Sequence, residues 1–427
     1  MNRLTQNVVL LTGSHLCTNP RSVKEADSLT KMGFEVEVLG RQDLPGLFEQ
    51  DKILLKNRRW KFSPSIFKPM PLSKMIGRAQ RFVGNQLFRS FGLENRWQLG
   101  PLAAALYKEA RKRSASLYIA HSEVGMWAAE QLRKEGKRVG VDMEDWFSED
   151  LLPEARRNRP VQFLKKLETN LLCKGVHSTC TSEAMADALV KKYGCKRPTV
   201  IRNVFPRKER EELDGKWKDR PGMARWMTSN DPKAARPKEA PVSIHWFSQT
   251  IGPGRGLESL FLAMDGLEGN WELHLRGNLK GYEGWLERVC PTNVRGKLKV
   301  HGLVRNEELL SRIAEHDIGF AGELVEPTSR NLTITNKFFQ YMQAGLVVVA
   351  SDTKGQREVA SEADGGVVLY SSGDADKLEL ILNCLIGKSG DMAERRGLAW
   401  NAGTRLCWEN EQTKLVEAIN ETHEHKR

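Results

Sequence analysis

The amino-acid sequence predicts an α/β protein with two doubly wound parallel-sheet domains. The chain has 427 residues, which is more than a single hydrophobic core usually serves. Short apolar runs alternate with segments of helical spacing along most of it, as in proteins with parallel sheets. Residues 206–241 interrupt this alternation, because they are rich in charge and proline and lack apolar periodicity, so we expect a linker there.

In the first half, apolar runs rich in Val and Leu are interpreted as buried strands, and the segments between them as helices. Ser182 is a good N-cap residue and Gly194 a good helix stop, which delimits the helix between them. The expected strands are 7–12, 34–39, 117–120, 138–143, 177–180 and 199–202, and the expected helices are 22–32, 124–135 and 182–193.

The second half repeats the pattern after the linker. Ligands of such sheets bind beyond the carboxyl ends of the strands, so two facing domains are expected to form a cleft. The expected strands are 242–248, 271–276, 298–301, 318–321 and 346–351, and the expected helices are 257–265, 282–289, 306–316 and 336–344.

The composition is that of a globular protein in a reducing compartment. Apolar residues make up 40% of the chain and charged residues 28%, which excludes a disordered protein. The seven cysteines are scattered and none has CxxC spacing, which argues against a disulfide framework. The N-terminus leads directly into a strand, and no apolar run approaches the roughly 18 residues of a membrane span. We therefore expect a cytoplasmic protein.

The net charge of +12 is concentrated in residues 50–90, where Asp51 is the one acid. Such a local excess predicts an anionic partner. Residues 73–88 combine cations with roughly helical apolar spacing, which suits a surface helix on an anionic membrane. The alternative is a stretch that packs on its own domain; nucleic acid is not expected, because no binding motif accompanies the charge. The ten basic residues are Lys52, Lys56, Arg58, Arg59, Lys61, Lys68, Lys74, Arg78, Arg81 and Arg89.

A glycine-rich turn lies between a predicted strand and a predicted helix, at Gly252, Gly254 and Gly256. Glycines let backbone amides approach an anion, and the helix N-terminus adds partial positive charge. Arg255 can add a bidentate phosphate contact. The alternative is an ordinary tight turn. A dinucleotide site is disfavoured, because the spacing is not GxGxxG and the next strand ends on Arg276.

A second polar segment leads into the helix 336–344 and the strand after it. Asn336 and Lys337 stand at the start of this helix, Gln340 lies one turn further on, and Gly345 ends it. A lysine in the first turn opposes the helix dipole, which is tolerable where an anion binds the same place. The alternative is a capped helix with a solvated lysine.

Together these segments resemble retaining glycosyltransferase family 4, also called glycosyl transferases group 1. TNKFFQYMQAGLVVVAS resembles the family pattern PNKLFEYMAAGLPVIAS, and FSQTIGPGRGLESL resembles FVGRLVPEKGLDLL. In the first half, NPRSVKEADSLTKMGFEVEVL resembles DPRVRREARALAEAGHEVTVL. The resemblance covers most of the chain apart from about 44–100 and 206–241.

The resemblance implies the GT-B fold, in which two Rossmann-like domains face each other across a cleft. Residues 1–205 would form the acceptor-side domain, 206–241 the linker and 242–407 the donor domain. The closing segment 408–427 would be a helix that crosses back to the first domain.

In the implied donor site, Arg255 takes the position of the family's diphosphate-binding lysine, and Lys337 is expected to help stabilise the leaving diphosphate. Three positions depart from the family. Gln249 stands for an arginine, and Gln340 and Leu332 stand for carboxylates, of which the one at 340 holds the donor ribose. The implied donor-binding residues are Gln249, Gly254, Gly256, Val304, Glu326, Asn336 and Gln340.

In the first domain, LYIAHSEVGMWAA resembles a family segment whose histidine lines the catalytic cleft, so His121 is the third implied catalytic residue. The alternative is a structural histidine at the end of a strand. No metal is expected, because no further ligand follows Asp142 and Glu144 at suitable spacing, and no cofactor is implied. The implied acceptor-binding residues are Gly13, Asn19, Arg21, Asp142 and Glu144.

The resemblance implies a retaining, hexosyltransferase-like enzyme that moves a sugar from a nucleotide-sugar to a glycan or lipid-linked acceptor, without a metal. Polysaccharide biosynthesis and a peripheral position on the inner face of the plasma membrane would fit this function. The alternatives are a sugar-nucleotide epimerase of the same fold and an inactive sugar-nucleotide-binding scaffold protein, which the substitutions at 249, 332 and 340 keep open.

Overall fold

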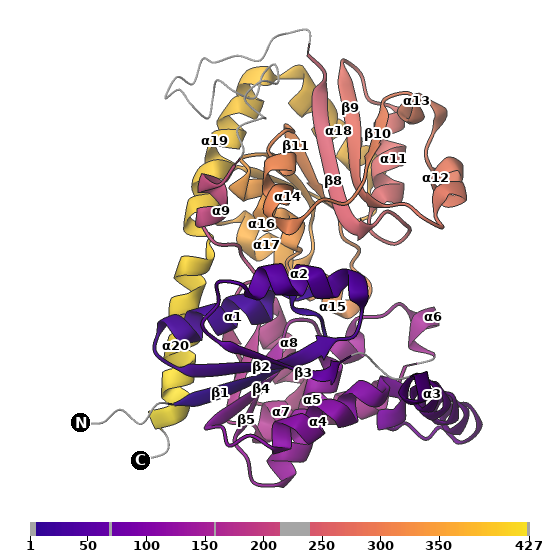
Figure 1. Ribbon diagram of the computed structural model, residues 1–427. Helices are drawn as coiled ribbons and strands as arrows, with labels where there is room; N and C mark the ends of the chain where they lie inside the picture. Colours follow the sequence, from indigo (N-terminus) through magenta and orange to yellow (C-terminus); the bar gives the residue numbers. More distant parts are fainter. Residues whose placement is uncertain (1–5, 68–70, 158, 214–239, 425–427) are drawn as a thin grey trace. The chain divides into compact units, whose positions relative to one another are not determined.

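The computed structural model describes residues 6–67, 71–157, 159–213 and 240–424 (Figure 1). It divides into two compact units. Unit 1 comprises Met1–Arg202 together with Glu411–Arg427, and unit 2 comprises Asn203–Asn410. Each unit is a parallel sheet with helices on both faces, as the alternation of strands and helices predicts.

The sheet of unit 1 has seven strands in the order β3-β2-β1-β4-β5-β6-β7. The order reverses between β1 and β4, which pair in parallel, and such a reversal opens a crevice at the carboxyl ends of these strands. The strands are β1 (Asn7–Leu11), β2 (Glu35–Gln42), β3 (Lys61–Phe67), β4 (Leu117–Ala120), β5 (Val139–Met143), β6 (His177–Cys180) and β7 (Thr199–Val200).

The helices α4, α5 and α7 pack side by side on one face of this sheet, and α1 and α20 lie on the other (Figure 1). The α-helices of unit 1 are α1 (Pro20–Lys31), α2 (Pro45–Leu55), α3 (Pro71–Phe91), α4 (Pro101–Arg111), α5 (Ser122–Lys134), α6 (Pro153–Arg156), α7 (Val161–Lys174) and α8 (Glu183–Tyr193), with the shorter η1 (Leu16–Thr18), η2 (Arg96–Leu99) and η3 (Phe147–Glu149).

The C-terminal helix α20 (Trp408–Glu424) belongs mostly to unit 1. Glu411 accepts a hydrogen bond from the backbone N–H of Arg202 at 2.9 Å. Further along, the Arg138 side chain donates to the carbonyl of Thr422. The helix therefore fastens the end of the chain to the sheet of unit 1.

The elements of unit 1 that were not predicted include the strand β3 and the helices α2, α4, α6 and α7. Lys61 and Pro64 interrupt the sequence of β3, so this strand has neither an apolar run nor strict alternation. It lies at the edge of the sheet, next to β2. Proline is tolerated at such an edge because one side of the strand needs no ladder hydrogen bond.

The sheet of unit 2 has six parallel strands in the order β10-β9-β8-β11-β12-β13. Its core is built around fully buried side chains such as Trp246 and Phe261. The strands are β8 (Val242–Thr250), β9 (Trp271–Asn278), β10 (Leu298–His301), β11 (Ile318–Ala321), β12 (Val347–Ser351) and β13 (Val367–Tyr370).

The helix α11 packs against α18, and α16 packs against α19. The helices of unit 2 are α9 (Lys208–Glu211), α11 (Leu257–Asp265), α12 (Glu283–Val289), α13 (Thr292–Arg295), α14 (Asn306–Ile313), α15 (Thr328–Leu332), α16 (Asn336–Gln343), α17 (Lys354–Ala360), α18 (Ala375–Gly387) and α19 (Ser389–Arg405). Most of the predicted linker, 214–239, lies outside the described residues.

Four histidines of unit 2 pack together: His245, His274 and His301 lie in β8, β9 and β10, and His316 lies just before β11. The ring of His245 stacks on that of His316, with centroids 4.4 Å apart, and His274 lies 4.5 Å from His316. His274 Nδ1 is 2.9 Å from Nε2 of His301. Burial, and then the neighbouring Arg276, His274 and His301, lower the pKa of His245 well below its ordinary value.

Within the described part of the chain, no helix combines the length and apolar character needed to cross a bilayer.

Candidate functional site

In unit 2 the glycine-rich turn joins β8 to α11 at the carboxyl edge of the sheet. Gly254 and Gly256 have φ of 74° and 76°, in the left-handed region that favours glycine. A Cβ at residue 256 would lie 3.1 Å from the backbone of Gly322. The turn is thus packed closely onto the chain that leaves β11, and the backbone N–H of Gly254 donates to Glu258 at 3.0 Å.

Three cations gather at this edge, which we call the cation cluster: Arg255, Arg330 and Lys337. Lys337 Nζ lies 3.2 Å from Glu323 Oε1 and 3.4 Å from Thr335 Oγ1. The guanidinium of Arg330 donates to the carbonyl of Gly254 and has no carboxylate partner among the described residues. Arg255 has neither a hydrogen bond nor an ion pair with any described residue. Of the three cations, Lys337 is therefore the one that has a carboxylate partner among the described residues.

The electrostatics of Lys337 show that these charges act on one another. Its side chain is almost fully buried, and burial lowers its pKa. Glu323 raises that pKa again, whereas Arg255 and Arg330 lower it further. An added anion would relieve this repulsion, because an opposite charge nearby favours the protonated lysine.

Two helix N-termini reinforce the positive potential. The nine-residue α11 follows Gly256, and the eight-residue α16 follows Thr335; neither N-cap residue provides a side-chain cap. Their free amides carry partial positive charge. The turn, the helix ends and the cation cluster together can hold an anion with two or more charges.

The other predicted donor residues also lie in unit 2, but they differ in burial and in their distance along the chain from the cation cluster. Gln340 is in α16, 6% exposed, and Gln249 is exposed at the end of β8. Asn336 accepts a hydrogen bond from Asn203 at 3.0 Å. Val304 follows β10, and Glu326 is exposed in the loop before α15.

Glu323 and Arg330 were not singled out in the sequence. Both lie in the segment between β11 and α16, which contains only the short α15. The available signal was topological, since every loop that follows a parallel strand emerges at the ligand-binding edge.

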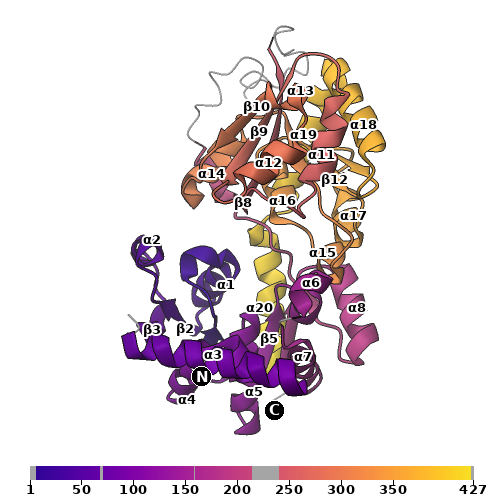
Figure 2. The same ribbon diagram turned by 90° about the vertical axis from the view of Figure 1, so that its right-hand side faces the viewer.

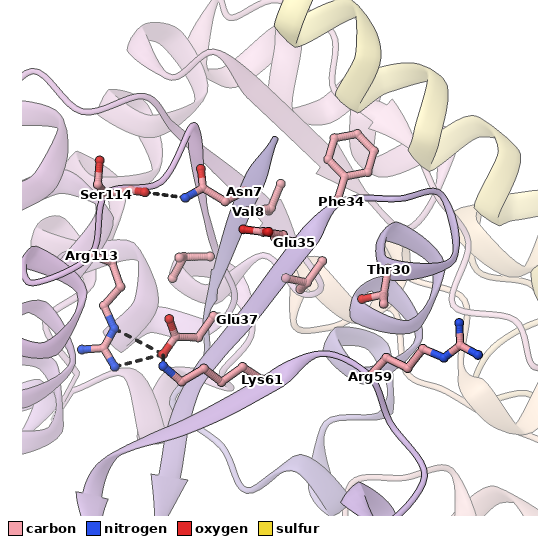
Figure 3. A pocket seen from close by; sticks show the side chains of 12 residues that line it. Asn7, Val8, Thr30, Phe34, Glu35, Glu37, Arg59, Lys61, Arg113 and Ser114 are labelled. Carbon is pink, nitrogen blue, oxygen red and sulfur yellow. Dashed lines mark hydrogen bonds and ion pairs between the residues drawn. The ribbon is translucent and has the colours of Figure 1, made fainter. Parts of the chain in front are cut away.

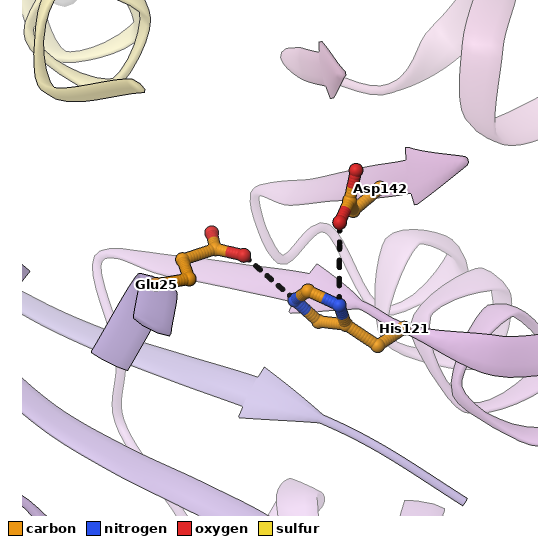
Figure 4. Close-up of side chains that lie close together, drawn as sticks. All are labelled: Glu25, His121 and Asp142. Carbon is orange, nitrogen blue, oxygen red and sulfur yellow. Dashed lines mark ion pairs between the residues drawn. The ribbon is translucent and has the colours of Figure 1, made fainter. Parts of the chain in front are cut away.

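In unit 1, His121 lies at the end of β4 between the carboxylates of Glu25 and Asp142 (Figure 4), with that of Glu144 also in contact. Its Nδ1 is 2.7 Å from Glu144 Oε1 and 3.4 Å from Asp142 Oδ2. Its Nε2 is 2.8 Å from Glu25 Oε2, an ion-pair distance without hydrogen-bond geometry. Glu25 comes from α1 and Asp142 from β5, so the fold assembles the group from three elements.

The predicted acceptor residues join this network. Arg21 binds Asp142 through two nitrogens, at 2.5 and 2.8 Å, and Asn19 donates to Glu144 at 3.0 Å. The backbone N–H of Gly13 donates to Ser122 next to His121. Of the predicted residues, Asn19, Arg21, His121, Asp142 and Glu144 therefore form one carboxylate–imidazole network.

Both cations of this network, Arg21 and His121, have carboxylate partners. Burial alone would lower the pKa of His121, but Glu25, Glu144 and Asp142 raise it well above its ordinary value. Burial opposes ionisation of Asp142, but Arg21 and His121 bring its pKa down to about 2. His121 is thus a fully buried imidazolium with carboxylates at both nitrogens. A direct contact with a sugar would require one of these partners to move.

Three residues of the network have the arrangement of metal ligands, although their spacing along the chain does not reveal it. One ligand atom each of Glu25, His121 and Asp142 lie within 4.8 Å of one another, as a metal site would need. Asp142, however, already accepts from Arg21 and from Thr179 at 2.7 Å. These donors and the imidazolium take the place that a cation would occupy. That no metal is needed stays a prediction.

A separate cavity of about 510 Å³ opens at the opposite, amino edge of the sheet of unit 1 (Figure 3). It is lined by the first residues of β1, β2 and β3, among them Asn7, Glu35 and Lys61. Arg113 and Lys61 both pair with Glu37 there, at 2.9 and 3.5 Å. The cavity is remote from the carboxyl edge and contains none of the predicted site residues.

Comparisons with known proteins bear on both units. Residues 247–387 match the family model described as Glycosyl transferases group 1. No curated protein sequence matches the chain.

Solved structures match it over nearly its whole length. Sucrose-phosphate synthase from Thermosynechococcus elongatus is 14% identical with a TM-score of 0.70, covering 98% of this chain and 100% of the other. HepE from Anabaena, solved with UDP-glucose, is 16% identical with a TM-score of 0.66, covering 97% and 99%. The trehalose-6-phosphate protein from E. coli, bound with UDP-2-fluoro glucose, is 13% identical with a TM-score of 0.62, covering 96% and 98%.

These matches confirm the predicted GT-B fold and the resemblance to the group 1 glycosyltransferases. The matched segment contains the glycine-rich turn and all three members of the cation cluster. The narrower resemblance to family 4 stays a prediction.

Proposed function

We propose that this protein is a retaining glycosyltransferase that moves a hexose from a nucleoside-diphosphate donor to a hydroxyl group of a glycan or lipid-linked acceptor. The observation that carries the proposal is the cation cluster, in which Lys337 pairs with Glu323 while Arg255 and Arg330 have no carboxylate partner among the described residues, beside two helix ends without side-chain caps. The group 1 match covers this same segment.

The chemistry requires a place for the charge that develops on the leaving group. As the bond between the anomeric carbon and the diphosphate oxygen breaks, negative charge grows on the diphosphate. Arg255, Arg330 and Lys337 would stabilise it in a site that is already organised, so little reorganisation is needed during reaction. The acceptor oxygen bonds to the anomeric carbon from the leaving-group face, and its proton passes to the departing phosphate.

Arg330 offers an answer to the missing arginine at position 249. Gln249 is exposed and uncharged, whereas Arg330 is half-buried and anchored to the glycine-rich turn through the carbonyl of Gly254. A guanidinium held there can meet the diphosphate with its remaining donors. We assign the second phosphate-binding cation to Arg330.

The role of unit 1 in this proposal is to receive the acceptor. His121 and its carboxylate partners form a buried ion-pair network at the carboxyl edge of the sheet. The imidazolium would act by holding Glu25 and Glu144 in place at this edge, and it would not accept a proton. No metal and no cofactor take part in the proposed reaction.

Donor binding is the first test. Uridine-, guanosine- and adenosine-diphosphate sugars would be added one at a time while the unfolding temperature of the protein is measured; UDP-sugars come first, since HepE was solved with UDP-glucose. We expect at least one to stabilise the wild type and the Lys377→Ala control, in which an exposed cation of α18 is removed, but not Arg255→Ala. Absence of stabilisation by every donor would contradict the proposal.

Release of the nucleotide separates the enzymatic alternatives. A transferase releases the nucleoside diphosphate in proportion to acceptor consumed, whereas an epimerase interconverts sugars without net release when no acceptor is present. Donor binding without either reaction would leave the scaffold alternative.

A further inference from the structure

The helix α3 presents an apolar face to solvent, on the side away from the rest of unit 1. Met75 and Phe82, seven residues apart and so on one line of the helix, are 65% and 64% exposed. Ile76 and Val83 form a second exposed line beside them. A soluble surface helix normally turns such lines toward the core.

The opposite side of α3 is its contact with unit 1, and it is made by glycines. Gly77 and Gly84 are buried, and a Cβ on either would lie within 3.0 Å of Pro101 or Trp97. The line of Gly77 and Gly84 lies about 200° around the helix from that of Met75 and Phe82, at 100° per residue. The exposed apolar face is therefore fixed by the packing of the helix.

Cations border this face, and acids are absent from it. Arg78 and Arg89 lie next to Phe82 around the helix, and both are exposed. The sequence of α3 contains no Asp or Glu. A helix with an apolar face and a basic edge has the character of interfacial helices that bind anionic lipid surfaces.

Fewer basic residues of the stretch 50–90 are available to bind an anionic surface than its composition suggests. Asp51 is buried and binds His15 Nδ1 at 2.6 Å, so it does not neutralise the surface. On the other hand, Lys52, Arg58 and Lys61 form ion pairs with Glu49, Asp27 and Glu37. Lys68 and the side chain of Lys74 lie outside the described part. The exposed cations that accompany an apolar face are those of α3.

We infer that α3 docks unit 1 onto an anionic lipid bilayer, with Met75, Ile76, Phe82 and Val83 entering the interface and Arg78 meeting lipid phosphates. In both views α3 lies at the margin of unit 1 as one long helix (Figure 2). Charge complementarity selects the bilayer over a second copy of this chain, because two such faces would bring like charges together. This inference does not depend on the donor chemistry of unit 2.

Cosedimentation of the full chain with vesicles tests the inference. We expect the wild type to bind vesicles of phosphatidylcholine mixed with phosphatidylglycerol and to remain unbound with phosphatidylcholine alone, with binding that weakens as salt is added. Met75→Ser with Phe82→Ser should reduce the partition coefficient by about tenfold or more, and Arg78→Ala by several-fold. Equal binding to both vesicle types, or binding to neither, would overturn it.

Matched controls exist in unit 2. Leu262 and Leu380 are 63% and 62% exposed, so Leu262→Ser with Leu380→Ser removes equally exposed apolar side chains from elsewhere. Lys388→Ala is the control for Arg78→Ala. Unfolding temperatures of all variants should match the wild type, since the altered side chains contact little. If the controls lose binding as much as the α3 variants, or if the α3 variants change the sedimentation coefficient of the protein without lipid, the lipid assignment is wrong.

Discussion

The two charged clusters at the carboxyl edges of the sheets differ in whether their cations are paired with carboxylates. In unit 2, Arg255 and Arg330 have no carboxylate partner among the described residues and Lys337 has Glu323. In unit 1, Arg21 and His121 are met by Glu25, Asp142 and Glu144. Partly buried cations without carboxylate partners are costly unless an anionic ligand completes the cluster, whereas the cations of unit 1 are already paired. We therefore expect unit 2 to bind the negative charge of the ligand and the ion pairs of unit 1 to hold its side chains in position.

The largest expected effect is on the stability of unit 1. Arg21→Met would leave Asp142 buried without its cation, and breaking such a pair costs about 3–5 kcal/mol in the free energy of unfolding. Chemical denaturation of wild type and variant measures this. The comparison predicts that the affinity of unit 2 for donor stays unchanged in the folded variant. Loss of donor binding with little loss of stability would reverse the assignment of roles.

Lys337→Ala should show the opposite pattern. Removing one preorganised donor to a developing oxyanion costs about 3 kcal/mol, or roughly a hundredfold in kcat/KM. The unfolding free energy should fall little, because the substitution also relieves repulsion from Arg255 and Arg330. Steady-state kinetics beside denaturation would separate the two quantities. A variant that is strongly destabilised but catalytically intact would show that Lys337 only supports Glu323.

The pH dependence of stability should also differ between the units. His121 has a raised pKa, so its contribution is fully present below the unfolded value near 6.5 and is lost as the pH rises through the folded value. His245 has a lowered pKa, so its contribution is present above about 6.5 and is lost as the pH falls. Each such group changes the free energy of unfolding by at most about 1.4 kcal/mol per pH unit.

His245→Phe tests the acid side, because it keeps an aromatic ring beside His316 without a titrating group. We expect the decline of the unfolding temperature between about pH 6.5 and 5 to become shallower than in the wild type. An unchanged slope would mean that the other histidines of unit 2 carry the acid sensitivity.

The smallest effect is expected from Gln249→Arg, which restores the arginine of the family pattern. If Arg330 already serves as the second phosphate-binding cation, an exposed arginine adds only a few-fold in donor affinity, and less at high salt. Titration calorimetry at two salt concentrations measures this. A gain of about a hundredfold would show that position 249 is vacant and that Arg330 does something else.

Much of the fold could be predicted because local patterns determine it. The strands at 117–120, 177–180, 298–301 and 318–321 and the helix 257–265 occur with the predicted bounds. Apolar runs specify the strands 117–120 and 318–321, and the glycine-rich turn marks the start of the helix. The edge strand β3 was not predicted, because Lys61 and Pro64 interrupt the apolar pattern.

The candidate site was predicted in part. Glycines 254 and 256 and residues 336 and 337 stand in local motifs, so their positions at the edge could be expected. Glu25, Glu323 and Arg330 reach the sites from elements far apart in sequence, and no spacing along the chain signals that. The sequence could not show which cations of the two clusters have carboxylate partners, because these partners are brought together only by the fold.

The central claim is that the cation cluster binds the diphosphate of the donor. Titration calorimetry of the wild type and Arg330→Ala with the donor found by screening, and with the matching nucleoside lacking phosphates, tests it most directly. We predict that Arg330→Ala weakens the nucleotide-sugar by about ten- to a hundredfold, the value of one charge-assisted contact, and leaves the nucleoside unchanged. Equal weakening of both ligands, or of neither, would contradict the claim.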